Sequence, residues 1–194
     1  MADVQSSLHE NLTKIILSEL EIKERVAEMA EQISAHYQAL NACELTVVGI
    51  LRGAVVFMSD LIRLMPLPLT IDFMAISSYG DSTTSSGAVR ILKDVSEAIV
   101  GRHVLVVEDI VDTGLTLKCL LDVLWARRPQ SLAVCALLNK PSRRQVEVAV
   151  DFCGFAIPDE FVVGYGLDFR GYYRNLPYIG VLKPESYGQA SANI

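Results

Sequence analysis

The amino-acid sequence predicts an α/β protein in which a parallel, twisted sheet is flanked by helices. Short apolar runs alternate with segments of helical length, which is the order of elements expected for a parallel sheet. Each of these runs is apolar at nearly every position, as is typical of strands that are covered on both faces. From Phe152 onward the pattern changes to short strands, aromatic residues and turns.

This change of pattern predicts how the chain is organised. We expect one domain over residues 1–185, with its core at about 40–150. A small C-terminal hood is expected at about 151–185, together with the N-terminal helix. Residues 186–194 are expected to be a disordered tail.

The first predicted element is an amphipathic helix that follows a polar start. Ser18 to Glu21 fits a capping box, in which the serine and glutamate side chains satisfy free N–H groups at the start of a helix. Apolar residues then recur at helical spacing, namely Ile22, Val26, Met29, Ile33, Tyr37 and Leu40.

The remaining elements follow from apolar runs and from the residues that interrupt them. Pro66 and Pro68 end the second helix, and a small polar stretch predicts a mobile loop. Trp125 is expected on a buried helix face. In chain order we expect strand Leu45–Leu51, helix Gly53–Met65, strand Leu69–Ser77, loop Ser78–Gly87, strand Val104–Val107, a helix that opens within Glu108–Thr116 and runs to about Arg128, and strand Ser131–Leu138.

Composition and charge exclude several classes of protein. The 194 residues are 51% hydrophobic and 21% charged, which is the composition of a globular domain with a sizeable core. The formal net charge of -6 opposes nucleic-acid binding, which needs a basic surface. No signal-like N-terminus and no apolar run near 18 residues is present, so we expect a cytoplasmic protein without membrane association. Four dispersed cysteines, Cys43, Cys119, Cys135 and Cys153, are expected to be reduced core residues.

One segment, VLVVEDIVDTGLTL, carries the clearest chemical signal. A buried strand ends in Glu108 and Asp109, and a Thr113-Gly114 turn then leads into a helix. In open α/β sheets ligands bind beyond the carboxyl ends of the strands, where free N–H groups at a helix start suit a phosphate. Gly114 permits close approach of the backbone, and the hydroxyls of Thr113 and Thr116 add donors.

The carboxylates of this segment imply a cation. Acidic groups beside a phosphate would repel it unless a hard cation lay between them, which indicates Mg²⁺. Taken alone, Asp112 and Thr113 would only cap the helix, and Glu108 and Asp109 would be solvated charges. A cap needs only one such residue, so the complete run favours a ligand site.

This segment resembles the phosphoribosyl pyrophosphate motif of the type I phosphoribosyltransferases, whose members share a parallel sheet and a variable hood. Further segments resemble the hypoxanthine-guanine branch of that family, and the resemblance spans about Leu45 to Lys183. The sequence departs from the family at Ala54, where many members have glycine, and at Leu115, where some have lysine. The matching segments are Leu51–Ala54, Ser78–Gly80, Asn139–Pro141, Phe161–Asp168 and the single residue Arg174.

The resemblance implies a purine salvage enzyme. Such an enzyme transfers ribose 5-phosphate from phosphoribosyl pyrophosphate to N9 of hypoxanthine or guanine, giving IMP or GMP and pyrophosphate. Three alternatives stay open: a sibling enzyme for another base, a non-catalytic regulator that binds phosphoribosyl pyrophosphate, and a generic nucleotide-binding domain. Acidic charge opposes the regulator, and the lack of a P-loop or dinucleotide motif opposes the generic domain.

The resemblance assigns roles around the sugar and its phosphates. Glu108 and Asp109 would hold the ribose hydroxyls and Mg²⁺, and Asp168 would reach a second metal site. Asp112 would act as general base near N7 of the purine. The backbone of Asp112, Thr113, Gly114, Leu115 and Thr116 would bind the 5-phosphate.

Other matched residues would bind pyrophosphate and exclude water. Leu51, Arg52 and Gly53 would bind pyrophosphate through the backbone, where the family often has a cis peptide between Leu51 and Arg52, and Arg174 would bind it as well. Ser78 and Tyr79 would close over the reacting centre, because an oxocarbenium-like state must be shielded from hydrolysis.

The remaining matched residues would surround the base. Lys140 would donate to O6, Phe161 would stack on the purine, and Val162 would meet its edge through the backbone. Ile110 would pack beneath the ring, and Asp168 would lie near position 2. Taken singly, Lys140 is more often a lysine that extends from a strand end to solvent, and the apolar residues are core.

The apolar surface of the first helix and of Gly53–Met65 exceeds what one small sheet covers. We therefore expect a homodimer or a homotetramer. The sequence leaves open the preference between hypoxanthine and guanine, the use of xanthine and the choice between the two assemblies.

Overall fold

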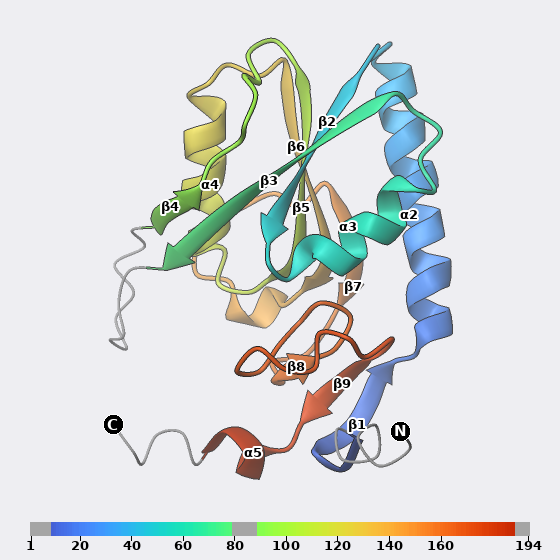
Figure 1. Cartoon of the computed structure of the whole chain (residues 1–194), viewed down its shortest axis with the longest axis vertical. Coiled ribbons are helices and arrows are strands. Elements are labelled where there is room, and N and C mark those ends of the chain that lie inside the picture. Colours follow the sequence, from blue (N-terminus) through green and yellow to red (C-terminus); the bar gives the residue numbers. More distant parts are fainter. Residues whose placement is uncertain (1–8, 79–88, 189–194) are drawn as a thin grey trace. The chain divides into compact units, whose positions relative to one another are not determined.

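The computed structural model describes residues 9–78 and 89–188, which form two compact units (Figure 1). The larger unit is Arg25–Asp159, and the smaller one combines the described parts of Met1–Glu24 and Glu160–Ile194. Tyr79, and with it nearly all of the predicted loop Ser78–Gly87, lies outside the described residues.

A six-stranded sheet forms the centre of the larger unit, in the order β4-β3-β2-β5-β6-β7. Five neighbouring strands are parallel, as expected, whereas β4 pairs with β3 in the antiparallel direction. The sequence did not predict β4, because charged residues interrupt this short edge strand and leave no continuous apolar run. The strands are β2 Leu45–Leu51, β3 Leu69–Ser78, β4 Val89–Lys93, β5 His103–Val111, β6 Ser131–Asn139 and β7 Phe152–Ala156.

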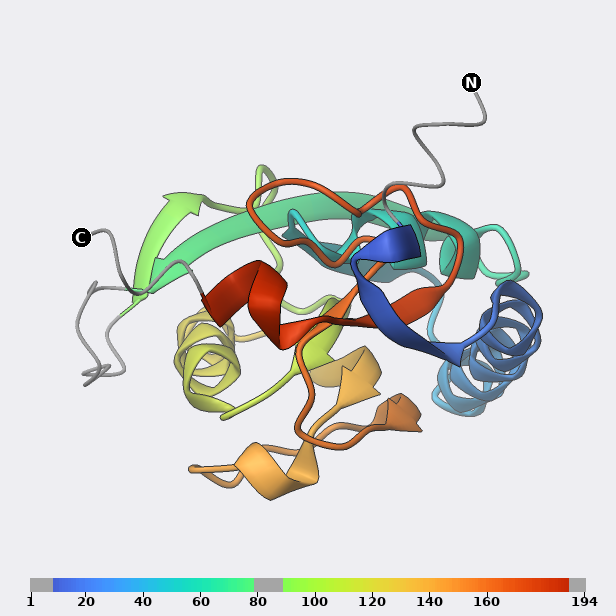
Figure 2. The ribbon, with the colours of Figure 1, turned by 90° about the horizontal axis from the view of Figure 1, so that it is seen from below.

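Helices α3, Ala54–Ile62, and α4, Leu115–Trp125, cover opposite faces of this sheet (Figure 2). Successive residues of a strand point to opposite faces, so β2 contributes to both layers. Gly49 faces α3, where an added Cβ atom would lie 2.4 Å from the sulfur of Met58. Val48 and Ile50 face the other way and belong to the apolar cluster that contains Leu117 and Leu120 of α4.

Helix α2, Glu19–Ala39, begins with the predicted capping box. The Glu21 carboxylate accepts hydrogen bonds from the main-chain N–H and the hydroxyl of Ser18 at 2.8 and 2.6 Å, and the N–H of Glu21 donates to the Ser18 hydroxyl at 3.3 Å. The predicted apolar positions are buried from Ile22 to Tyr37, but Leu40 is exposed. Leu40 differs because the helix ends at Ala39.

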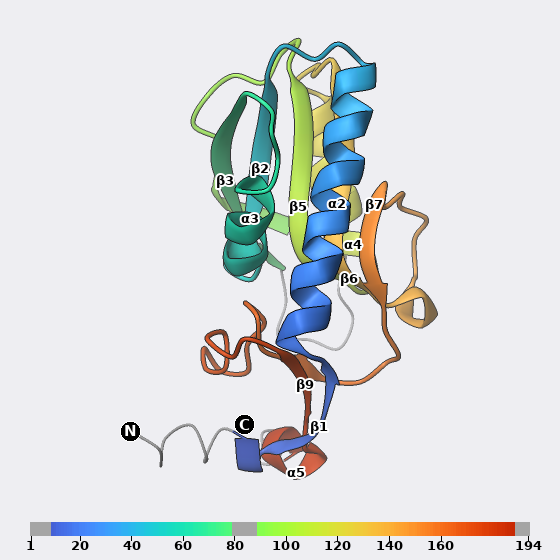
Figure 3. The same cartoon turned by 90° about the vertical axis from the view of Figure 1, so that its right-hand side faces the viewer.

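The smaller unit contains a three-stranded antiparallel sheet in the order β1-β9-β8. Figure 3 shows β1 and β9 side by side. The sequence did not predict β1, because half of its residues are exposed and only Leu12 and Leu17 are buried. The unit has its own apolar cluster, which includes Leu12, Val163, Leu176 and Leu182. Its elements are β1 Leu12–Leu17, β8 Val162–Val163, β9 Ile179–Leu182 and helix α5 Pro184–Gly188.

Several predicted boundaries need correction. Strand β7 pairs with β6 in the main sheet, so the larger unit continues to Asp159 and past the expected hood boundary near 151. Strand β5 continues to Val111, because Ile110 and Val111 pair with Leu138 and Asn139 of β6. Helix α5 includes residues 186–188 of the expected tail, and residues 189–194 lie outside the described residues.

Two predictions about side chains also differ from the structure. Trp125 is 51% exposed at the last position of α4, whereas Leu124 before it is buried, so Trp125 is not a core residue. All four cysteines are free, as predicted, but Cys43 is exposed and only Cys135 is buried.

The helices of the described residues include none with the length and apolar character that a membrane span requires.

Candidate active site

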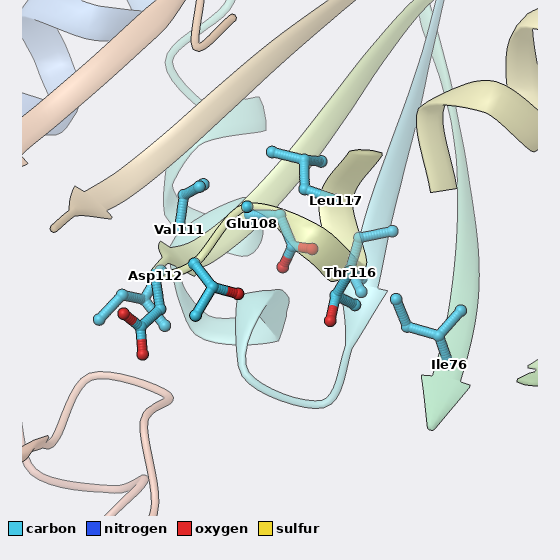
Figure 4. A pocket seen from close by; sticks show the side chains of 10 residues that line it. Ile76, Glu108, Val111, Asp112, Thr116 and Leu117 are labelled. Carbon is cyan, nitrogen blue, oxygen red and sulfur yellow. The ribbon is translucent and has the colours of Figure 1, made fainter. Parts of the chain in front are cut away.

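A pocket of about 230 Å³ lies at the carboxyl ends of β2, β3 and β5 and at the start of α4 (Figure 4). This is the edge of a parallel sheet at which ligands are expected to bind. Six of its residues were predicted from the sequence to be site residues: Glu108, Ile110, Asp112, Thr113, Gly114 and Thr116. The others are Ile50, Ile76, Val111 and Leu117. The four additional residues are aliphatic, and nothing in the sequence distinguished them from core.

Glu108 is the most deeply buried acidic residue of this pocket, with 8% of its surface exposed. Burial raises the pKa of its carboxyl well above the usual value, and the negative charge of Asp109 raises it further. Two adjacent carboxyl groups in such an environment are a donor set that suits a hard divalent cation, because its charge would stabilise the ionised form.

The Asp109 side chain lies against the turn that follows β2. An added Cβ atom at Gly53 would lie 1.5 Å from Oδ2 of Asp109, so the carboxylate occupies the space that any larger residue would need. The other oxygen, Oδ1, accepts a hydrogen bond from the N–H of Ile110 at 2.8 Å. The peptide between Leu51 and Arg52 is cis, as the family resemblance implied. The structure therefore brings the predicted pyrophosphate turn and the acidic pair together.

The turn into α4 is formed around a glycine at the start of the helix. Gly114 precedes the helix with a φ of 82°, a left-handed conformation that favours glycine. The N–H of Leu115 donates to the Thr113 hydroxyl at 3.4 Å. Thr113 therefore satisfies an N–H group at the start of α4, as expected for a residue that caps the helix. Leu115 is the first residue of the helix and, unlike Thr116, does not line the pocket.

Lys140 directly follows β6 and is 8% exposed. Its Nζ atom lies 3.7 Å from Oδ1 of Asp159. The guanidinium of Arg143 lies 3.5 Å from the other Asp159 oxygen, and its Nε donates to Oδ1 of Asp112 at 3.2 Å. A chain of alternating charges therefore joins Asp112 to Lys140.

Arg143 and Arg144 are functional candidates that the sequence did not reveal. They follow the matched segment Asn139–Pro141, and two surface arginines carry no distinctive pattern of their own. They become candidates only in the folded structure, where both contact residues 112–114. The Nη1 atom of Arg144 donates to the main-chain oxygen of Asp112 at 2.9 Å.

In the smaller unit, Asp168 and Arg174 form an ion pair with an N–O distance of 2.5 Å. Arg174 also donates to the main-chain oxygen of Gly166, and the N–H of Gly171 donates to Asp168 at 2.7 Å. Phe161 is 39% exposed and packs edge to face on Phe169, with the ring centroids 5.7 Å apart. The partly exposed ring could stack on a planar ligand.

Val162 is buried in β8 and pairs with Val181 of β9. Ser78 is the last residue of β3, next to the undescribed segment. Within residues 9–78 and 89–188, no group of three or more histidine, cysteine, aspartate or glutamate side chains is close enough to hold a metal ion.

Residues 13–170 match the family described as the phosphoribosyl transferase domain, which is more than half of the chain. The chain belongs to the phosphoribosyltransferase family. It is 52% identical over 166 residues to the hypoxanthine phosphoribosyltransferase of Haemophilus influenzae, covering 86% of this chain and 93% of that protein. It is 46% identical over 177 residues to the hypoxanthine-guanine phosphoribosyltransferase of Bacillus subtilis, covering 91% and 97% of the two chains.

A solved phosphoribosyltransferase has the same fold. The hypoxanthine phosphoribosyltransferase of Staphylococcus aureus superposes with a TM-score of 0.89 at 46% identity, covering 93% of this chain and 97% of that one. The chain also matches the bifunctional protein TilS/HprT of Listeria monocytogenes, with 46% identity over 183 residues. That match covers 94% of this chain, which spans only 28% of the length of the bifunctional protein.

Membership of the family confirms the predicted type I phosphoribosyltransferase fold. It also implies a requirement for a divalent metal ion, which agrees with the carboxyl pair of Glu108 and Asp109. The pocket at the end of β5 lies at the edge where ligands are expected to bind in open parallel sheets.

Proposed function

We propose that this phosphoribosyltransferase acts in purine salvage. It transfers ribose 5-phosphate from phosphoribosyl pyrophosphate to N9 of hypoxanthine or guanine and releases pyrophosphate with IMP or GMP. The observation that carries this proposal is the pocket in which Glu108, Asp112 and the Thr113–Gly114 turn lie together. Relatives of nearly equal length that are named for these two bases support the choice of base.

The 5-phosphate would be held by the backbone of residues 112–116 and by the hydroxyls of Thr113 and Thr116. Free N–H groups at the start of α4 suit a phosphate dianion. Glu108 and Asp109 would position the ribose hydroxyls next to the metal.

Asp112 is the proposed general base, which would accept the proton from N7 of the purine. Its ion pair with Arg143 is made through Oδ1, so Oδ2 would accept the proton while Oδ1 stays bound to the guanidinium. Lys140 would donate to O6 of the base, Ile110 would pack beneath the ring, and Phe161 would stack on it. The backbone of Val162 and the region of Asp168 would meet the remaining edge.

Pyrophosphate would be bound by the main chain of Leu51, Arg52 and Gly53 and by the guanidinium of Arg174. Because Asp109 fills the space beside Gly53, this turn is held next to the acidic pair in the larger unit. Ser78 and Tyr79 would cover the reacting centre and exclude water.

We propose Mg²⁺ as the metal. Glu108 and Asp109 would hold one ion, and Asp168 would reach a second, through water. The ion would supply positive charge beside a polyanionic substrate. Excess chelator should abolish turnover and added Mg²⁺ should restore it, whereas full activity in metal-free enzyme would contradict the assignment.

We also propose that residues 1–185 act as one catalytic domain in the cytoplasm. Three exposed apolar residues favour a homodimer or a homotetramer, namely Val55 in α3, Leu64 just after this helix and Ile71 on β3. Light scattering at micromolar concentration would measure the mass, and a monomer would contradict this part of the proposal.

The test of the function is product identification. The protein is incubated with phosphoribosyl pyrophosphate, Mg²⁺ and hypoxanthine, guanine, xanthine, adenine or uracil, and the nucleotides are identified by mass spectrometry. IMP and GMP are the expected products. A different nucleotide as main product would indicate a sibling enzyme, and binding of phosphoribosyl pyrophosphate without any product would indicate a non-catalytic regulator.

A further inference from the structure

The main-chain oxygens of Val111, the last residue of β5, and of the next two residues face the chain from the end of β6 onward. The oxygen of Val111 accepts from the N–H of Lys140 at 2.9 Å. The oxygen of Thr113 accepts from the N–H groups of Gln145 and Val146 at 2.9 and 3.4 Å. Residues 139–146 are therefore a support on which this loop rests.

The oxygen between these two, that of Asp112, has a side-chain donor. Nη1 of Arg144 donates to it at 2.9 Å, and Nη2 of the same guanidinium donates to the side-chain oxygen of Asn139. The Arg144 side chain also packs along Gly114, where an added Cβ atom would lie 3.1 Å from its Cδ and Nη1 atoms. One arginine thus joins the end of β6 to the centre of the loop.

These contacts also determine where the N–H groups on the other side of the loop point. In a trans peptide the C=O of one residue and the N–H of the next point in opposite directions. With the oxygens of residues 111–113 directed toward residues 139–146, the N–H groups of residues 112–114 point away from that support. Successive N–H groups that point the same way form an anion-binding concavity.

The pocket lies on the side to which these N–H groups point. In the strand order, β2 and β3 are on one side of β5 and β6 is on the other. Ile50 of β2 and Ile76 of β3 line the pocket, whereas its lining includes no residue from 139–146. The support and the pocket therefore lie on opposite sides of the loop.

We propose that Arg144 is a positioning residue, which orients the Asp112–Thr113 peptide so that the N–H of Thr113 points at the substrate phosphate. This inference rests on the proposed function, because it takes the ligand of the loop to be a 5-phosphate. Arg144 does not touch the ligand in this scheme. It acts through a carbonyl oxygen on the far side of the peptide.

The arrangement requires the guanidinium fork rather than a positive charge alone. Arginine presents several N–H donors in a fixed plane, so one side chain holds the Asp112 oxygen and the Asn139 oxygen at the same time. Lysine keeps the charge but offers a single donor atom on a flexible stem. Comparison of Arg144→Lys with Arg144→Gln therefore separates two effects, the hydrogen-bond geometry of the guanidinium and the long-range attraction of its charge for the phosphate.

Arg25 provides a matched control within the larger unit. Its Nε and Nη2 donate to the main-chain oxygens of Gly154 and Cys153 at 3.0 and 2.7 Å, so it too is a partly buried arginine that holds backbone. These backbone contacts are on β7, and its Nη1 atom pairs with Glu28 of α2 at 2.6 Å, so none of these partners lies in residues 111–114. Arg25→Gln removes the same number of charges and a similar set of hydrogen bonds.

The experiment is calorimetric titration of wild type, Arg144→Gln, Arg144→Lys and Arg25→Gln with GMP and with guanosine. The measured quantity is the ratio of the two affinities, which isolates the contribution of the phosphate. We expect both Arg144 variants to lose about 10- to 100-fold in this ratio, the range for a hydrogen bond to a charged group. Affinity for guanosine should be unchanged in all four proteins, and Arg25→Gln should keep the wild-type ratio.

A wild-type ratio in Arg144→Gln would overturn the inference, as would restoration of the full ratio by Arg144→Lys, because charge alone would then suffice. If Arg144→Gln does not fold, as judged by guanosine binding, Arg144→Lys alone decides between these results. A wild-type protein that binds GMP no better than guanosine would contradict the proposed function instead.

Discussion

The carboxylate of Asp109 lies in the space that a side chain at Gly53 would need: a methyl group on Gly53 would lie 1.5 Å from the Oδ2 atom of Asp109. Gly53 has a φ of -62° and a ψ of -39°, which any residue can adopt. The glycine is therefore needed for space and not for backbone freedom. This contact links the turn proposed to bind pyrophosphate with a carboxylate proposed to bind metal.

The first prediction follows from this contact. Gly53→Ala should displace the Asp109 carboxylate and lower kcat/KM about 100-fold, the typical cost of a misplacement near 1 Å at a reacting centre. Gly101→Ala is the control, because Gly101 has a φ of 70° and nothing within 4 Å of an added Cβ atom. The control should lose stability through backbone strain but keep its activity. Equal activity in the two variants would show that the contact has no role.

A conservative substitution of Asp112 tests its proposed role as general base directly. Asp112→Asn keeps the shape of the side chain and an oxygen for Arg143, but it removes the proton acceptor. We expect kcat to fall by a factor of about 10² to 10⁴ while GMP affinity stays within about tenfold. Asp122→Asn, which removes only an exposed pair with Lys118 on α4, should change neither quantity. Near-normal turnover in Asp112→Asn would leave that residue with a structural role alone.

The loss of stability as the pH falls should depend in part on Asp72, which lies in β3. Burial alone would raise the pKa of Asp72, but hydrogen bonds from the N–H groups of Phe73 and Ser96 and the ammonium of Lys93 outweigh it, so the pKa lies below its usual value. A carboxyl group with a lowered folded-state pKa stabilises the protein above its unfolded pKa of about 3.9. That contribution is lost as the pH falls through the lower folded-state value.

Asp72→Asn should therefore lower the free energy of unfolding by about 1 to 3 kcal/mol at pH 7, because charge-assisted hydrogen bonds are lost. The difference from wild type should shrink below pH of about 4. Urea unfolding at pH 7 and pH 3 measures both values. Asp60→Asn, which removes an exposed ion pair with Arg63, should cost little at either pH. A constant difference across this range would contradict the linkage.

The main sheet was predictable because its central strands are buried on both faces. Strand β2 has the predicted bounds, and β3 and β6 differ from theirs by one residue at the carboxyl end. Strands β1 and β4 were missed because they lie at edges and mix exposed with buried residues. An edge strand is defined by its partner, which lies far away in the sequence.

The candidate site was predictable where its residues are consecutive. Residues 108–116 follow one strand, so their motif places acids, hydroxyls and glycine together without knowledge of the fold. Arg144 lies 32 residues from Asp112, and only the parallel pairing of β5 and β6 brings the two together. The pairing of Asp168 with Arg174 likewise depends on the turns between them and not on the identity of either residue.

The choice of base tests the central claim most directly. Lys140 is 8% exposed, and its ammonium can donate to O6 of hypoxanthine or guanine but has no acceptor for the amino group of adenine. The measurement is kcat/KM for hypoxanthine, guanine and adenine with wild type and Lys140→Ala. For wild type we expect similar values for hypoxanthine and guanine and a value about 10⁴-fold lower for adenine, with much of that discrimination lost in Lys140→Ala. Adenine used by wild type within about tenfold of hypoxanthine would contradict the 6-oxopurine assignment.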